Sequence, residues 1–209
     1  MDQPLKWLAD LNDTAWSKLA EAARSGLPVP NGFVVFPRTA EEDIRSAYDE
    51  LKMREKTHFL VIRGPSHAVL NVLMPDPLIH TLRRLWKESL GAPLFVQRMV
   101  HSMWCGSAEW HRKNLWVKAN EGLLILEPDT YVFSTTVGRC IRRALEPKQR
   151  KLIRYVDGTM RTVERQGERI PLSVEQLKNI ADLAGRVQGN MTWAIDDRDT
   201  VWLIGLTPL

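Results

Sequence analysis

The stretch SGLPVPNGFVVFP, residues 25–37, joins two different patterns of apolar residues. Before it, residues 14–24 (TAWSKLAEAAR) are rich in alanine and carry apolar residues at helical spacing, and Gly26 is a typical helix stop. Pro28 and Pro30 then hold the chain extended and prevent the helix from continuing, and the following FVVF is β-branched and aromatic, as in a buried strand. The stretch therefore predicts a helix, a stiff turn and a strand.

The rest of the chain mixes helical and extended patterns, with no internal repeat and no low-complexity linker. Ser173 and Gln176 have the spacing of a capping box at the start of the last helix. Further helices are expected at 41–56, 75–91, 137–145 and 173–188. Strands are expected at 58–64, 92–104, 115–119, 122–126 and 130–135. Residues 157–169 look like an exposed hairpin. Two more strands are expected in 191–206, on either side of the polar turn DDRD. These elements predict an α+β fold of two lobes, residues 1–94 and 95–209, with mixed or antiparallel sheets.

The composition limits the classes of protein to which this chain can belong. The chain has 209 residues, 44% of them apolar, which is enough for a real core, and its net charge of +4 permits anionic partners without requiring them. The N-terminus has no signal-peptide pattern and no stretch reaches the length of a membrane span, so we expect a cytoplasmic protein that does not interact with membranes. Cys105 and Cys140 are expected to be ordinary thiols, and no His or Cys spacing predicts a metal site.

Eight tryptophans are a high number for this length. Trp104, Trp110 and Trp116 recur every six residues, which places them on one face of a strand if the strand stays regular. We expect them to pack in a core, and a stacking platform for bases is the alternative.

Six segments, taken in order, resemble the nucleotide-binding domain of phosphoenolpyruvate synthase and pyruvate phosphate dikinase, a branch of the ATP-grasp proteins. The segments are LAEAARSGLPVPNGFVV, FLVIRG, LNVL, VQRMV, EPDTYVF and MTWAIDDRDTVWLIGLTPL. The resemblance implies an ATP-grasp-like fold that binds ATP between two lobes and belongs among ATP-dependent phosphotransferases. It implies phosphate binding by Arg63, and adenine binding at the hinge by Gln97, Met99 and Val100. The partner is then a nucleotide or a phosphorylated small molecule.

Several positions depart from the family pattern. Ala15 stands where the family has a phosphate-binding lysine, and Thr192 where it has a metal-binding glutamate. Gly205 and Thr207 replace the Gln and Arg of its last strand, and the segment that covers the phosphates is shortened after Arg63. Because phosphoryl transfer needs cations and magnesium at these places, we assign no catalytic residue and expect ATP binding without independent phosphotransfer. A neutral threonine also argues against magnesium.

Two alternatives stay open. A partner protein could supply the missing cation, metal ligand and phosphate carrier, which would make this chain a subunit of a phosphotransferase. Alternatively, residues 138–154 carry seven basic residues and one acidic residue, which is the charge pattern of a nucleic-acid or protein-binding surface. The sequence contains no recognised nucleic-acid motif beside this segment, so the solvated surface of a helix is the simpler interpretation.

Overall fold

The computed structural model describes residues 5–12, 15–57, 59–64, 68–73, 75–123, 128–146, 150–154, 159–164, 171–187 and 189–207. Contacts divide the chain into two compact units, which we describe separately. The first unit comprises Met1–Arg24 and Pro30–Met99, and the second comprises Ser25–Val29 and Val100–Leu209. We expected a boundary between residues 94 and 95; the strand that begins there instead lies in the first unit, because it is the central strand of that unit's sheet.

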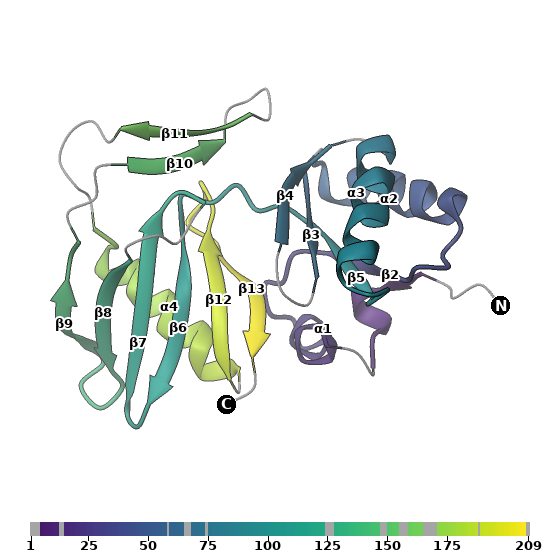
Figure 1. The fold of residues 1–209 in the computed structure, drawn as a ribbon. Coiled ribbons are helices and arrows are strands. Elements are labelled where there is room, and N and C mark those ends of the chain that lie inside the picture. The colour runs from purple at the N-terminus through teal and green to yellow at the C-terminus, as the bar shows by residue number, and fades with distance from the viewer. Residues whose placement is uncertain are drawn as a thin grey trace. The chain divides into compact units, whose positions relative to one another are not determined.

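The first unit is an antiparallel five-stranded sheet, with strand order β1-β2-β5-β3-β4, and its helices (Figure 1). The predicted helices at 41–56 and 75–91 and the predicted strand at 58–64 are confirmed, while the first helix begins three residues later than expected. The elements are β1 (Lys6–Trp7), η1 (Leu8–Asp10), α1 (Ser17–Arg24), β2 (Gly32–Val35), α2 (Glu41–Glu55), β3 (Leu60–Arg63), β4 (Ala68–Val72), α3 (Pro75–Glu88) and β5 (Leu94–Arg98).

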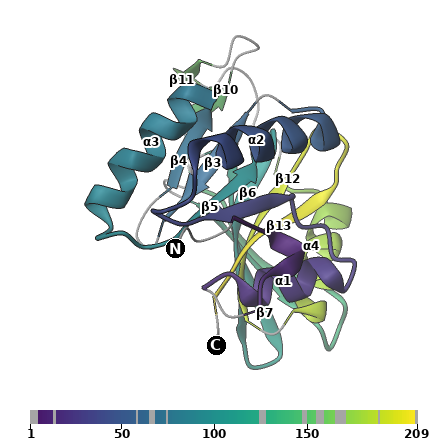
Figure 2. The same ribbon diagram turned by 90° about the vertical axis from the view of Figure 1, so that its right-hand side faces the viewer.

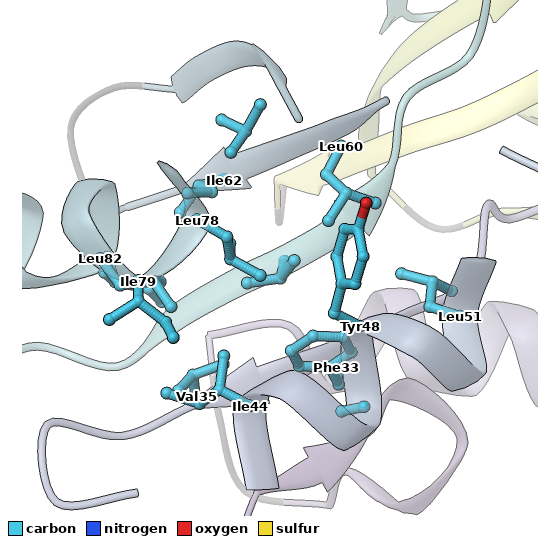
Figure 3. Packing of buried hydrophobic residues seen from close by; sticks show 14 of the residues in the cluster. Phe33, Val35, Ile44, Tyr48, Leu51, Leu60, Ile62, Leu78, Ile79 and Leu82 are labelled. Atoms are coloured by element: carbon cyan, nitrogen blue, oxygen red, sulfur yellow. The ribbon is translucent and has the colours of Figure 1, made fainter. Parts of the chain in front are cut away.

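The core of the first unit lies between its sheet and the pair α2 and α3. Side chains from both helices and from four strands meet there, with Phe33, Tyr48 and Leu82 among those that are 4% exposed or less (Figure 3). On the opposite side of β2 and β5 lies α1 (Figure 2), where the rings of Trp16 and Phe95 are 5.7 Å apart. These two strands are therefore buried on both faces, which explains why β2 and the first three residues of β5 are apolar.

The turn at residues 25–31 contributes one carbonyl to each unit. The backbone N–H of Leu203 donates to the Pro28 carbonyl at 2.8 Å in the second unit. In the first unit, Gln97 Nε2 donates to the Pro30 carbonyl at 2.9 Å. Gly32 follows the turn, and a Cβ at this position would lie 2.3 Å from the carbonyl oxygen of Val96, so only glycine allows the strands to approach this closely. The helix, stiff turn and strand predicted around this stretch are confirmed.

The second unit is an antiparallel six-stranded sheet, with strand order β13-β12-β6-β7-β8-β9, and α4 packs on one of its faces (Figures 1 and 2). The helix begins at a complete capping box formed by Ser173 and Gln176, as predicted. A separate two-stranded sheet pairs β10 with β11. The elements are β6 (Trp104–His111), β7 (Asn114–Glu121), β8 (Asp129–Ser134), β9 (Arg139–Ala144), β10 (Arg150–Arg154), β11 (Met160–Glu164), α4 (Val174–Arg186), β12 (Asn190–Ile195) and β13 (Val201–Thr207).

Two predictions for the second unit are wrong. Residues 137–145 form no helix, because β9 pairs with β8, and this pairing overrides the local helical spacing. Trp104, Trp110 and Trp116 do not share one strand face, because the chain reverses at Arg112, whose φ is 57°, and Trp116 lies on the next strand. Most of the expected strand at 122–126 falls outside the described residues. No described helix has the length and apolar character needed to cross a membrane.

Candidate functional site

Arg63 ends the apolar strand β3 and is a partly buried cation. Its backbone pairs with Phe95 of β5 and Ala68 of β4, so the residue is held in the middle of three strands. Burial lowers the pKa of the Arg63 guanidinium to about 10, which still leaves it charged at neutral pH. Within the described part of the chain no carboxylate pairs with it, so the cost of burying this charge is not offset by an ion pair there.

Gln97 lies on β5 with its side chain fully buried. Its Oε1 accepts a hydrogen bond from Arg63 Nε at 3.2 Å, and its Nε2 donates to the Pro30 carbonyl at 2.9 Å. The structure therefore brings the predicted site residues Arg63 and Gln97 into direct contact. Because both ends of the Gln97 amide already form hydrogen bonds, its role is to orient the Arg63 guanidinium.

Glu55, the last residue of α2, fixes the same turn from another side. Its carboxylate accepts hydrogen bonds from the Asn31 amide and from Arg98 Nη1, the latter at 3.1 Å. The Arg98 and Glu55 side chains are only 20% and 13% exposed, so this ion pair is shielded from water. Since Arg98 follows Gln97 on β5, the Glu55 contacts hold the turn and this strand together.

The other two predicted residues are packing positions. The backbone N–H of Met99 donates to the Phe59 carbonyl at 3.0 Å, and its side chain is buried. Val100 belongs to the second unit, where it packs in a cluster with Cys105 and Ile204. A role for either residue in binding adenine stays a prediction.

Two of the positions that depart from the family pattern, Thr192 and Gly205, lie on the face of the second sheet that α4 does not cover. Trp110 Nε1 donates to the Ala184 carbonyl of α4 at 3.2 Å, so alternate residues of β6, including Ser107, face the other way. Strand register aligns Ser107 with Thr192 on one side and with Lys118 on the other, and Lys118 is exposed. This face therefore carries the hydroxyl groups of Ser107 and Thr192, the ammonium group of Lys118 and, two residues from Ser107 on β6, the carboxylate of Glu109.

Lys118 is the residue that sequence reasoning missed. It lies on β7 between buried Val117 and Ala119, and the alternation of NLWVKANE would have placed it on an open sheet face. Gly205, opposite Thr192 on β13, adds no side chain. Thr192 itself is a neutral ligand that fits magnesium poorly, because magnesium prefers carboxylate oxygens. The carboxylate on this face of β6, that of Glu109, lies 3.6 Å from His111 Nε2.

Asp196 organises the DDRD turn between β12 and β13. Its carboxylate accepts hydrogen bonds from Trp202 Nε1 at 2.8 Å and from the backbone N–H groups of Arg198 and Thr200 at 3.0 and 2.9 Å. Burial alone would raise the pKa of Asp196, but these hydrogen bonds outweigh it and hold the pKa below its usual value. Asp199 accepts from Gln176 at 2.8 Å. Two of the three aspartates therefore have structural roles, as expected for turn chemistry.

No protein-family model matches the chain, and no curated protein matches it. Solved structures do match. The D-alanine–D-alanine ligase of Bacillus anthracis is 12% identical with a TM-score of 0.54, over 93% of this chain and 55% of the ligase. The ligase of Coxiella burnetii is 12% identical with a TM-score of 0.52, over 92% of this chain and 46% of that one.

The VanG D-Ala:D-Ser ligase of Enterococcus faecalis is 13% identical with a TM-score of 0.53, over 96% of this chain and 53% of the ligase. The chain has an α+β, ATP-grasp-like fold. The predicted fold class is therefore confirmed. The ATP-grasp-like chain spans about half the length of these ligases.

Proposed function

We propose that this chain binds a nucleoside triphosphate, ATP, and that Arg63 contacts its phosphates. The fold supports the proposal, because a D-alanine–D-alanine ligase from Bacillus anthracis complexed with ATP matches 93% of the chain with a TM-score of 0.52 at 12% identity. The observation that carries it is the partly buried Arg63 guanidinium, for which the described residues provide no carboxylate partner. A phosphate would supply the missing negative charge.

Within the ATP-grasp-like fold, we propose a nucleotide-binding domain similar to that of phosphoenolpyruvate synthase and pyruvate phosphate dikinase. The six sequence segments that resemble this family, in the same order along the chain, support this narrower assignment. Independent phosphotransfer is not part of the proposal, since Ala15 and Thr192 provide neither the cation nor the carboxylate that the reaction needs. A partner chain that completes the reaction remains the alternative.

Calorimetric titration of the whole chain with ATP and with adenosine tests the proposal. Arg63→Met should weaken ATP binding about 10- to 100-fold, because a charge-assisted contact is lost, while adenosine binding should change little. Arg38→Met is a matched control, since Arg38 is an exposed arginine of the same unit. Undetectable ATP binding by the wild type at millimolar concentration would refute the proposal.

A polyanion-binding surface on β9 is the second candidate. The structure places Arg139, Arg142 and Arg143 on this strand, all of them exposed, where the sequence had indicated a helix. Arg139 and Arg142, opposite Ser134 and Val132 of β8, share one face of this edge strand and could contact successive phosphates of a nucleic acid, whereas Arg143 lies over the Tyr131 ring on the other face. Salt-sensitive retention on heparin together with a discrete gel shift would support this function, and retention without a discrete complex would contradict it.

A further inference from the structure

The side-chain amide of Gln97 connects two parts of the first unit. One end of this buried amide meets Arg63 at the end of β3, and the other meets Pro30 in the turn before β2. Both contacts span more than thirty residues of sequence, so neither is an accident of local geometry. A buried amide with a hydrogen bond at each end has one favoured orientation, because each lost bond leaves an unsatisfied polar group.

The Pro30 carbonyl determines which end of the amide faces Arg63. A carbonyl can only accept, so the Nε2 group must turn toward Pro30 and Oε1 must turn toward Arg63. A rotated amide would place its oxygen against the Pro30 carbonyl and its N–H groups against the Nε–H of Arg63, which loses both hydrogen bonds. The stiff proline turn thus presents an acceptor to the guanidinium.

Arg63 uses one of its five N–H groups in this contact. The donor is Nε, which fixes the plane of the guanidinium while leaving the four N–H groups on the two Nη atoms. Among the described residues, no hydrogen-bond acceptor is recorded for these Nη groups. Two Nη groups held in one plane form the fork that binds two oxygens of a phosphate.

We propose that Gln97 is a positioning residue that holds the Arg63 guanidinium preorganised for a bidentate phosphate contact, and that the Pro30 carbonyl sets the orientation of the Gln97 amide. This inference rests on the proposed function of Arg63 as a phosphate contact. It replaces the expectation that Gln97 binds the adenine. The role predicts that changes at Gln97 affect binding of the phosphates and leave binding of the nucleoside unchanged.

The first test needs no ligand. In a ¹H–¹⁵N spectrum of the whole chain, the Nε–H resonance of Arg63, assigned by its loss in Arg63→Lys, should exchange with water at least about tenfold more slowly than those of exposed arginines, as expected for a buried hydrogen bond. Gln97→Met should remove this protection. Exchange in the wild type as fast as that of the exposed arginines would overturn the proposal.

The second test measures binding of ATP, inorganic tripolyphosphate and adenosine by calorimetry. Gln97→Glu keeps the shape of the side chain but places a carboxylate beside Arg63, where it competes with the phosphates. We expect binding of ATP and of tripolyphosphate to weaken at least about tenfold, with adenosine affinity within about twofold of the wild type. Gln97→Met should show a smaller loss of the same selectivity.

Glu50→Gln is the matched control, because it removes a carboxylate of an exposed ion pair with Arg54 on the same helix and leaves the turn, Gln97 and Arg63 in place. It should leave the ratio of ATP to adenosine affinity unchanged. An equal loss of ATP and adenosine affinity in Gln97→Glu would overturn the positioning role. If tripolyphosphate binding depends on Gln97, the positioning role is supported even when the wild type binds no ATP. Absence of ATP binding by the wild type would refute only the proposed function.

Discussion

Replacement of Arg63 by methionine should stabilise the protein without ligand and abolish its preference for phosphorylated ligands. Burial lowers the pKa of Arg63 well below the ordinary value of an arginine, to about 10, and each pKa unit corresponds to about 1.4 kcal/mol. The buried cation therefore costs the folded state about 3 kcal/mol. Methionine has a similar length and removes this cost, but it leaves Gln97 Oε1 without its donor, which costs about 1–3 kcal/mol. The balance is a free energy of unfolding between unchanged and about 2 kcal/mol higher.

Urea denaturation of the wild type, Arg63→Met and Arg38→Met, each with and without ATP, measures both effects. Arg38→Met should stay within about 0.5 kcal/mol of the wild type, as is usual for an exposed residue. ATP should raise the stability of the wild type and of this control by more than that of Arg63→Met. A loss of more than about 2 kcal/mol in ligand-free Arg63→Met would refute the reasoning, because it would show that the guanidinium contributes to stability.

The pH dependence of the same variants has a definite sign. Below about pH 10, Arg63 is protonated in both the folded and the unfolded state, so the cost of burial is constant. Above about pH 10, up to the higher pKa of an arginine in the unfolded chain, the unfolded state binds the extra proton, and stability therefore rises with pH through this one group. The difference between wild type and Arg63→Met should accordingly shrink above pH 10.

Three further substitutions, two of them with a matched control, test the scaffold by urea denaturation. Gly106→Ala should lower the free energy of unfolding by at least about 2 kcal/mol, because the new Cβ would lie 1.9 Å from a carbonyl oxygen of β7. Its control, Gly205→Ala, should lower it by less than about 1 kcal/mol, because the nearest atom to that Cβ would be 3.7 Å away. Glu55→Gln should cost about 1–3 kcal/mol, against less than about 0.5 kcal/mol for Glu50→Gln in an exposed pair. Asp196→Ala should cost about 1–3 kcal/mol at neutral pH, and this difference should vanish as acid protonates the wild-type carboxylate below its lowered pKa.

Local signals were sufficient for the helices and for β2, β3 and β5 of the first unit, and for the last hairpin, whereas β1 and β4 were not predicted. Helices with clear caps, such as the one that begins at Ser173, and apolar strands bounded by Gly or Pro appear where they were expected. The failures have one cause. At β9 and at Arg112 the structure depends on pairing with a neighbouring strand, and strand pairing is invisible in a short window of sequence.

The same distinction between local patterns and strand pairing explains which residues of the candidate site could be predicted. Arg63 was found because it ends an apolar strand within a family motif, and a polar residue there stands out. The contact of Gln97 with Pro30 joins positions 67 residues apart, so no local pattern could reveal it. Lys118 was hidden by its ordinary place in an alternating strand, and only the sheet register shows which face it shares with Thr192.

The proline turn also limits how this protein can be divided. The chain passes from one unit to the other after residues 24, 29 and 99, so neither unit is encoded by one uninterrupted stretch. A fragment that begins at Val100 would lack the Pro28 carbonyl and would leave the N–H of Leu203 exposed on β13, whose strand neighbour among the described residues is β12 alone. Exposed strand edges favour aggregation. Neither unit can therefore be separated cleanly from the other, and recombination or domain transfer would have to move both units together.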